Sequence, residues 1–206
     1  MGLSLITLLV LQTPALKAPA RDLHNGLTRN YRVTIEQDGG DEFSYRLGMK
    51  IVVPKSPIGK DVETKLELKL TNYKATVSGQ QVSVGKMGGG VLELGSTGLP
   101  LGLEIAGPQG PVWLPMLAFY YPSAHEDGDF LIDRIQVGTG IFMTGTGTLS
   151  HPGGKAAISF EMSLLRGDAP LGKVLLSASL DDKGWPRKAE GTLKSADGTY
   201  RFTLSG

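Results

Sequence analysis

The glycine-rich stretch VGTGIFMTGTGTLSHPGGK, residues 137–155, is the first place where chemistry could be sought. A phosphate-binding loop needs glycines followed by Lys-Ser/Thr at the start of a helix, or a G-x-G-x-x-G turn between a parallel strand and a helix. GTGIFMTG does not have its third glycine at the required place, GGKA lacks the hydroxyl, and the residues after both alternate as strands do. We therefore predict no phosphate site, but one strand over Val137–Leu149 that bends sharply or lets an aromatic ring lie on its backbone.

The glycines of this predicted strand would fall on both of its faces, because side chains alternate along a strand. Two pairs result: Gly138 and Gly140 beside Phe142 and Thr144, and Gly145 and Gly147 beside Ile141, Met143 and Leu149. We expect the second pair to mark a bend of the sheet over the apolar interior.

Polar residues that could bind a metal or attack a substrate are scattered. HEDGD, residues 125–129, lacks the D-x-[DN]-x-[DN]-G pattern of a calcium loop and the glutamate that follows it. The three histidines, at 24, 125 and 151, show no HxH or HExxH spacing, and no G-x-S-x-G motif occurs. A carboxylate pair for glycoside hydrolysis could come from distant strands, but no residue points to one. We predict no catalytic residue, no metal and no cofactor, and therefore no enzyme.

An apolar and aromatic segment is the remaining candidate site. It is VWLPMLAFYYP, residues 112–122, interrupted and flanked by prolines. Two interpretations stand: the segment fills the core of a sheet, or it covers a curved apolar face and leaves room for an apolar ligand. The second interpretation gives five candidate ligand-lining residues: Tyr45, Met49, Trp113, Phe119 and Tyr121.

Alternation with period two runs from Tyr31 to the last residues, and no helical period of comparable length occurs. Runs starting at Tyr31 and at Phe43 flank the turn DGGD and predict a hairpin. The alternation changes parity near Thr71-Asn72, which predicts a β-bulge or a break there. One face of the second strand is expected to be buried: Phe43, Tyr45, Leu47, Met49, Ile51 and Val53. We predict an all-β fold, an antiparallel meander of about 10–12 strands in a strongly curved sheet, open barrel or sandwich.

The first twenty residues, MGLSLITLLVLQTPALKAPA, predict a secretory signal peptide. An apolar run is followed by the small-x-small sequence Ala18-Pro19-Ala20, and nine apolar residues are too few to cross a bilayer that needs about 20. The expected domains are a signal peptide over 1–20 and one all-β domain over 21–206. The domain would contain two meander halves, about 27–106 and 130–206, joined by the irregular segment 107–123.

The composition of the chain limits the classes of binding partner that we expect. The chain has 21 Lys and Arg against 20 Asp and Glu, and residues 1–20 contain one lysine and no acid, so the expected mature chain is formally neutral. Nucleic acids and anionic membranes need a concentrated positive field, so we expect neither as main partner. Without cysteine, an exported chain can form no disulfide and carry no lipid on a cysteine. We expect a periplasmic or extracellular protein without a transmembrane span after processing.

Several segments together resemble an uncharacterised group of exported bacterial all-β proteins: YRVTIEQ, FSYRLGMKI, GLPLGLEIAG, EDGDF and LDDKGWPRKAEGTLKSADGTYRFTLS. The resemblance covers most of the mature chain and implies a meander that ends in a hairpin, with no implied activity. At the level of architecture the chain is also similar to open-barrel carriers of the LolA type. Two functions are therefore weighed: an exported structural or interaction domain whose partner is another envelope protein, and a carrier or sensor of a hydrophobic, lipid-like small molecule.

Overall fold

The computed structural model describes residues 20–54, 63–82, 88–95, 99–106, 112–122, 127–138 and 140–206. The predicted signal peptide therefore lies almost wholly outside the described residues. Strands dominate the described part, which confirms the all-β prediction. They are β1 Thr28–Gln37, β2 Glu42–Val52, β3 Thr64–Val77, β4 Gln80–Val82, β5 Gly89–Leu94, β6 Pro100–Ala106, β7 Gly128–Gly138, β8 Ile141–Ser150, β9 Ala157–Arg166, β10 Ala169–Leu180, β11 Pro186–Ser195 and β12 Gly198–Ser205.

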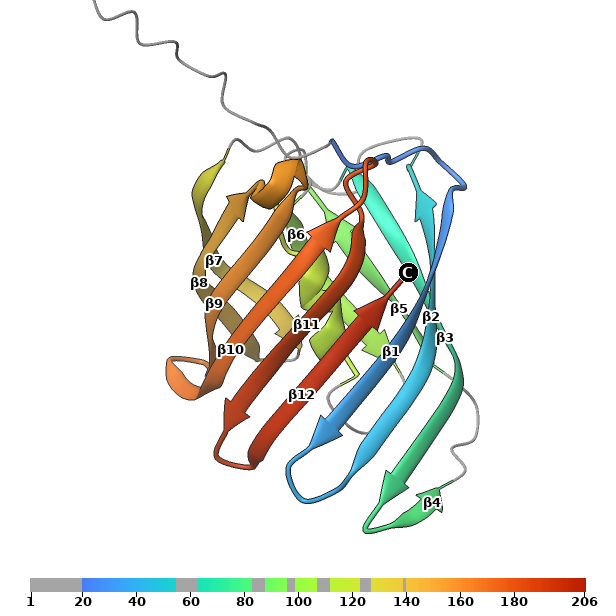
Figure 1. Cartoon of the computed structure of the whole chain (residues 1–206), viewed down its shortest axis with the longest axis vertical. Helices are drawn as coiled ribbons and strands as arrows, with labels where there is room; N and C mark the ends of the chain where they lie inside the picture. The colour runs from blue at the N-terminus through green and yellow to red at the C-terminus, as the bar shows by residue number, and fades with distance from the viewer. Residues whose placement is uncertain are drawn as a thin grey trace, which may run out of the picture.

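The strands form a closed barrel (Figure 1). Their order is β2-β1-β12-β11-β10-β9-β8-β7-β6-β5-β3, and the pairing of β2 with β3 closes the ring, while β4 pairs only with β3. Neighbours in the ring are antiparallel except β6 and β7, which are parallel and meet through the single pair Gly102–Gln136. The expected antiparallel meander is thus corrected: the barrel is mixed, because eleven strands cannot alternate in direction all the way round a ring.

The hairpin of β1 and β2 confirms the period-two prediction for this part of the chain. Its residues pair in register from Thr28–Lys50 to Glu36–Glu42. Five of the six residues expected on the buried face of β2 are at most 9% exposed, whereas Val53 lies beyond the strand and is 41% exposed. The prediction was wrong at Val53 because both β2 and its pairing with β3 end at Val52.

A β-bulge interrupts β3 where the alternation changes parity. Ser44 pairs with Lys74 and Arg46 with Thr71, so two residues of β3 face one residue of β2. Asn72 takes the left-handed conformation, with φ of 55°, which an asparagine tolerates better than most residues. The predicted bulge is confirmed, and β3 continues through it unbroken.

The glycine-rich stretch is two strands, not one. β7 ends at Gly138 and β8 begins at Ile141, and between them Gly140 has a φ of 67°. The prediction that Gly138 and Gly140 share a face with Phe142 is therefore wrong, because the chain reverses at this glycine. Gly145 and Gly147 do lie on the inward face of β8, in phase with the buried Met143 and Leu149.

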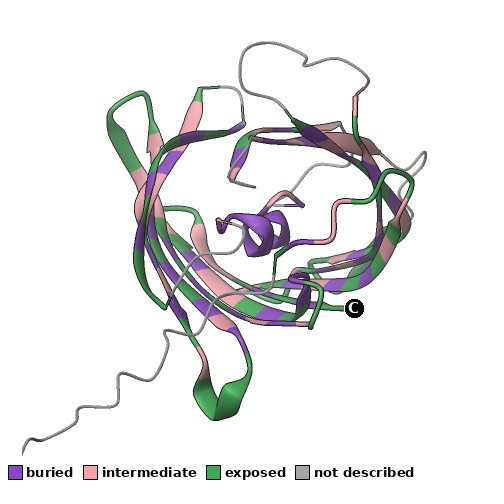
Figure 2. Cartoon of the chain, turned by 90° about the horizontal axis from the view of Figure 1, so that it is seen from above, coloured by how far each residue is buried: buried purple, intermediate pink, exposed green. Residues whose placement is uncertain are grey.

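The Pro- and aromatic-rich segment lies inside the barrel. Residues Leu114–Phe119 form a short 3-10 helix, η1, and all six are buried. The view from above shows η1 within the ring of strands (Figure 2), and it packs against β10, β11 and β12. A barrel of about eight strands is filled by its own side chains, so a ring of eleven leaves a wider lumen. Here η1 occupies that lumen, which makes this segment a plug and not a cover.

Candidate functional site

The first tether of the plug is Tyr45 on β2. Its hydroxyl donates a hydrogen bond of 2.7 Å to the carbonyl oxygen of Val112, just before η1. Tyr45 is 2% exposed, and its ring stacks against that of Tyr73 with centroids 6.2 Å apart. Burial raises the pKa of the Tyr45 hydroxyl well above its usual value. The hydroxyl therefore stays protonated and able to donate at any physiological pH.

The second tether is Arg21, which precedes β1 in the chain and contacts the C-terminal end of η1. Its guanidinium donates to the carbonyl oxygens of Phe119, at 3.0 Å, and Tyr121, at 3.4 Å. These carbonyls end a helix, where backbone acceptors lack helical partners and a positive charge is favourable. Arg21 is 5% exposed, and its guanidinium carbon lies 4.3 Å from the centroid of the Tyr121 ring. The arginine thus caps the plug through both charge and stacking.

Trp185 joins this tether to the barrel wall. Arg21 and Arg29 both lie over its ring, at 5.4 and 5.8 Å from the centroid, and its indole N–H donates to the carbonyl of Asp22 at 3.2 Å. The Tyr121 hydroxyl donates to the carbonyl oxygen of Gly184, which precedes the tryptophan. We call Arg21, Arg29, Asp181 and Trp185 the mouth cluster, since they gather where β1 and β11 begin and β10 ends.

The turn between β10 and β11 holds this cluster in place. One carboxylate oxygen of Asp181 accepts hydrogen bonds from the backbone N–H groups of Lys183, at 3.0 Å, and Trp185, at 2.8 Å. An aspartate that bonds its own following backbone stabilises a tight turn. The other oxygen of Asp181 lies 3.5 Å from Nη2 of Arg29. Asp181 therefore shapes the turn and also supplies the negative charge nearest to Arg29.

Four of the five predicted ligand-lining residues belong to the plug segment or bond to it: Trp113, Phe119 and Tyr121 lie within it, and Tyr45 bonds to Val112. The fifth, Met49 on β2, is part of the same buried core. Phe119 lies edge-on to Tyr31 and Trp185, with ring centroids 5.5 and 6.3 Å away. Four of the five are buried and Trp113 is partly buried: Tyr45, Met49, Phe119 and Tyr121 are each at most 2% exposed. The structure brings Phe119 and Tyr121 together at the mouth cluster and places Tyr45 at the other end of the plug.

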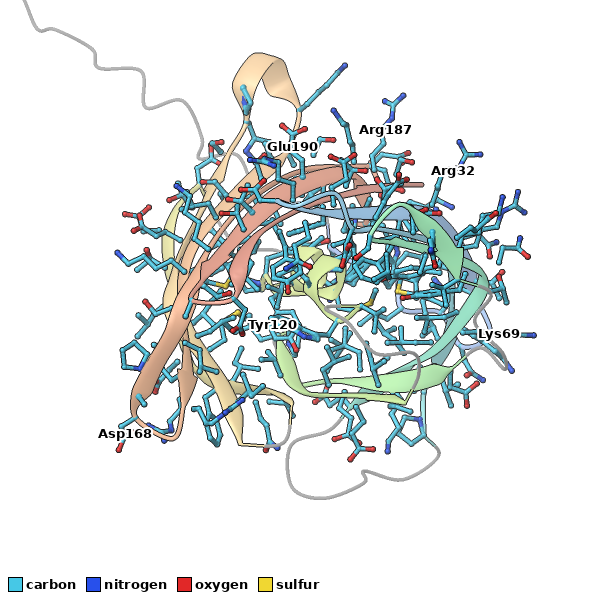
Figure 3. All side chains as sticks on the ribbon, turned by 90° about the horizontal axis from the view of Figure 1, so that it is seen from below. Arg32, Lys69, Tyr120, Asp168, Arg187 and Glu190 are labelled. Atoms are coloured by element: carbon cyan, nitrogen blue, oxygen red, sulfur yellow. The ribbon has the colours of Figure 1, made fainter. Side chains whose placement is uncertain are left out.

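Tyr120 is the unusual residue of the lumen. It is fully buried, and its hydroxyl has no hydrogen-bond partner among the described residues. Figure 3 shows Tyr120 inside the barrel, whereas Arg32, Lys69 and Asp168 project outwards. A buried tyrosine hydroxyl usually has a partner, and leaving it unpaired costs about 1–3 kcal/mol. Burial also raises the pKa of Tyr120 well above its usual value.

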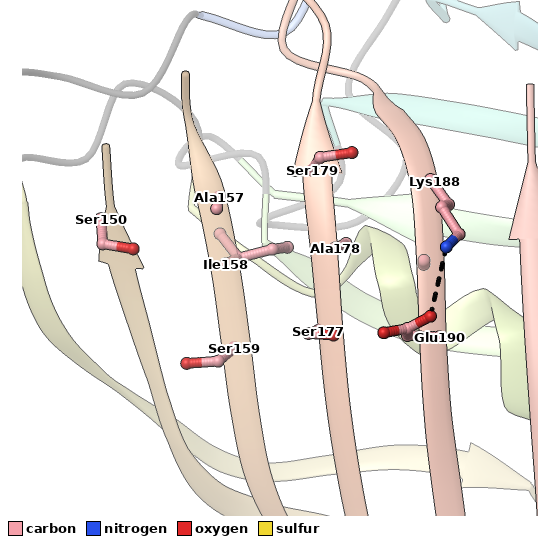
Figure 4. Close-up of a pocket in the computed structure, with 10 residues that line it drawn as sticks. Ser150, Ala157, Ile158, Ser159, Ser177, Ala178, Ser179, Lys188 and Glu190 are labelled. Carbon is pink, nitrogen blue, oxygen red and sulfur yellow. Dashed lines mark ion pairs between the residues drawn. The ribbon is translucent and has the colours of Figure 1, made fainter. Parts of the chain in front are cut away.

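The outer wall carries two shallow hollows. One of about 340 Å³ lies over β8–β11 and is lined mainly by serines and alanines, with Lys188 and Glu190 forming an exposed ion pair of 3.3 Å (Figure 4). The other, of about 570 Å³, lies over β9–β12 beside Leu175, which is 49% exposed. Exposed ion pairs contribute about 0–1 kcal/mol, so the pair of Lys188 and Glu190 adds little to the stability of this wall.

The described residues contain neither a metal-binding cluster nor a membrane-spanning helix. Within them, no group of three or more His, Asp or Glu side chains is arranged to hold a metal ion. His151 pairs with Asp127, and His24 with Asp22, so these two histidines lie in separate local contacts. Over the same part of the chain, no helix is long and apolar enough to cross a membrane.

Sequence reasoning missed Arg21, Arg29 and Trp185 as site residues. A signal for Arg29 was present: it is in phase with Tyr31 and with the next two inward residues of β1, so the alternation places a charge on the buried face. Arg21 and Trp185 gave no such signal, since they lie outside the regular alternation and are far apart in sequence.

Searches of protein-family models, of curated proteins and of solved structures found no match to this chain.

Proposed function

We propose that this chain is an exported, non-enzymatic interaction module: a rigid barrel that fills its own lumen and recognises its partner elsewhere. The observation that supports this proposal is the plug, whose six helical residues are buried and whose two ends are tethered by Tyr45 and Arg21. A lumen filled by the chain itself leaves less room for cargo. Recognition then falls to the barrel wall and to the mouth.

Dye binding and mass spectrometry test the proposal. We expect the native mass of protein purified from its own host to equal that of the polypeptide. We also expect N-phenyl-1-naphthylamine, an apolar dye, to show no saturable fluorescence increase. A double variant, Arg21→Met with Tyr45→Phe, removes both tethers and is expected to bind the dye, while the exposed-site control Arg32→Met is not. A co-purified apolar molecule in the wild-type protein would contradict the proposal.

A carrier of a hydrophobic molecule is the second candidate, and Tyr120 favours it. In a carrier, the unpaired hydroxyl would bond a polar group of the cargo inside the apolar lumen. The same mass measurement separates the two functions. A bound molecule that is lost in Tyr120→Phe, but kept in the surface variant Arg32→Met, would establish the carrier.

A further inference from the structure

We propose that the mouth of the barrel binds a small molecule through a single carboxylate group held by Arg29. This inference rests on the proposed recognition role and names its ligand class. The site is a hollow of about 720 Å³, the mouth hollow, to which residues from β1, β10 and β11 contribute. Its volume is in the range of about 300–1,000 Å³ typical of small-molecule sites. The residues used below are Arg29, Tyr31, Lys155, Asp181, Asp182 and Arg187, all of which line it.

Arg29 presents an unused hydrogen-bonding edge. Its Nε and Nη2 atoms are both shielded from solvent and both lack a hydrogen-bond partner among the described residues. These two nitrogens lie on the same edge of the guanidinium plane, which is the edge that binds both oxygens of a carboxylate. Asp181 is the nearest acid, at 3.5 Å from Nη2, which is longer than the roughly 2.7–2.9 Å of a charge-assisted hydrogen bond. Asp181 therefore balances part of the charge without filling the edge.

Asp181 cannot move onto this edge without loss elsewhere. Its other oxygen accepts the backbone N–H groups of Lys183 and Trp185, which fixes the carboxylate in the turn. Trp185 meanwhile lies beside the Arg29 guanidinium, 5.8 Å from its central carbon, and limits the positions that the arginine can take. The donor edge is thus held in position, without a hydrogen-bond partner among the described residues, by two neighbours that are themselves held by the fold.

The charges of the mouth hollow favour a ligand with one negative charge. Three basic side chains, Arg29, Lys155 and Arg187, face two acidic ones, Asp181 and Asp182. Gly206, which carries the terminal carboxylate, lines the hollow as well. A phosphate carrying nearly two charges would meet all of these acids, whereas a carboxylate brings a single charge to the two donors of the Arg29 edge. Buried apolar surface from Tyr31 and Leu180 lines the same hollow. The ligand class is therefore a monocarboxylate with an apolar or aromatic body.

Titration of the isotopically labelled protein with benzoate, followed through the arginine Nε–H signals, tests this site. The Arg29 signal is expected to shift saturably with benzoate, not with uncharged benzyl alcohol, and more weakly with inorganic phosphate. Arg29→Met should weaken benzoate binding by about 10-fold or more, since charge-assisted hydrogen bonds contribute about 1.5–3 kcal/mol. Asp181→Asn keeps the acceptor of the turn but removes the competing charge, so it should tighten binding.

Three controls keep the outcome clear. Arg32→Met removes an exposed arginine from the same strand and should leave benzoate affinity unchanged. Arg29→Lys keeps the charge but loses the two-pronged edge, and its affinity should fall between the wild type and Arg29→Met. Equal affinity in Arg29→Met, tighter binding of phosphate, or no saturable shift would overturn the proposal. The dye test of the lumen is independent, so failure at the mouth with a lumen closed to dye leaves the proposed function standing.

Discussion

Gly145 on β8 gives a sharp test of how the barrel wall is packed. A Cβ atom added to it would lie 2.7 Å from the Cα of Met162, and closer still to the carbonyl oxygen of Glu161, both on β9. Favourable carbon–carbon contacts lie at about 3.5–4.0 Å. The obstacle is backbone that is paired with β8 on one side and β10 on the other. We expect Gly145→Ala to lower the free energy of unfolding by more than about 3 kcal/mol, beyond the usual overpacking range.

Gly147, two residues further along the same face, meets a different obstacle. Its added Cβ would lie 2.6 Å from Cε2 of Phe130 and 2.8 Å from Cδ1 of Phe160. These two rings pack edge to face, with centroids 5.7 Å apart, so aromatic rings cover this glycine, which is one of the two alternatives that the sequence left open. Ring atoms can move by side-chain rotation. We therefore expect Gly147→Ala to cost only about 1–2 kcal/mol.

Urea unfolding followed by circular dichroism measures both costs. Gly48→Ala on β2 is the matched control, because its added Cβ would have no neighbour closer than 3.5 Å, and we expect it to be neutral or to stabilise by about 0.5–1 kcal/mol. Phe130→Leu should relieve Gly147→Ala, with a coupling of about 1 kcal/mol, and should not relieve Gly145→Ala. Equal costs at the two glycines, or relief of Gly145→Ala by Phe130→Leu, would refute this account of the wall.

Four further outcomes follow from burial and hydrogen bonding. Tyr120→Phe should raise the free energy of unfolding by about 1–3 kcal/mol in thermal melts, because it removes an unpaired buried hydroxyl; a loss would show that the hydroxyl has a partner in solution. Arg21→Met should destabilise by about 1.5–3 kcal/mol in urea, since two plug carbonyls lose their donor. Burial raises the pKa values of several tyrosines, among them Tyr45 and Tyr120, above those in the unfolded chain. Above about pH 10 the unfolded chain therefore loses tyrosine protons that the folded protein keeps, and the free energy of unfolding should fall as the pH rises. In Tyr120→Phe this fall should be less steep by about 1.4 kcal/mol per pH unit. The secreted protein should begin at Arg21, with cleavage after Ala15 as the next choice, and an N-terminus at Met1 would contradict export.

The alternation of apolar and polar residues was enough to predict those strands in which it is regular. The hairpin of β1 and β2 and the bulge at Asn72 could both be predicted because side-chain parity alone encodes them. β7 was not predicted as a strand because it contains its own bulge, in which two residues, Asp133 and Arg134, fall between the pairs formed by Ile132 and Ile135. This bulge puts Arg134 at a φ of 37° and breaks the alternation that a sequence pattern would need.

The mouth cluster could not be predicted in the same way, because its residues come from distant parts of the chain. β1 pairs with β12, and the turn before β11 then lies next to the start of β1. Arg29 and Asp181 meet only through this closure of the barrel. Alternation in a single sequence indicates where regular strands run, but not which of them are neighbours across the ring. The contacts of the cluster therefore depend on information that alternation does not carry.

The number of strands, the parallel pair and the plug are consequences of one another. A ring with an odd number of strands must contain a parallel pair, and here that pair is β6 and β7. Parallel neighbours that follow each other in sequence begin at the same end of the barrel, so the chain must travel back along the barrel between them. The described part of this connection is residues 112–122. Because this segment is apolar, it runs through the lumen of the barrel and not through solvent. Pro115 stands at the start of η1, where a proline is tolerated, and the lumen of an eleven-stranded ring is wide enough to take one helix of this kind. The connection between β6 and β7, which a ring with an odd number of strands requires, is thus the segment that fills the lumen.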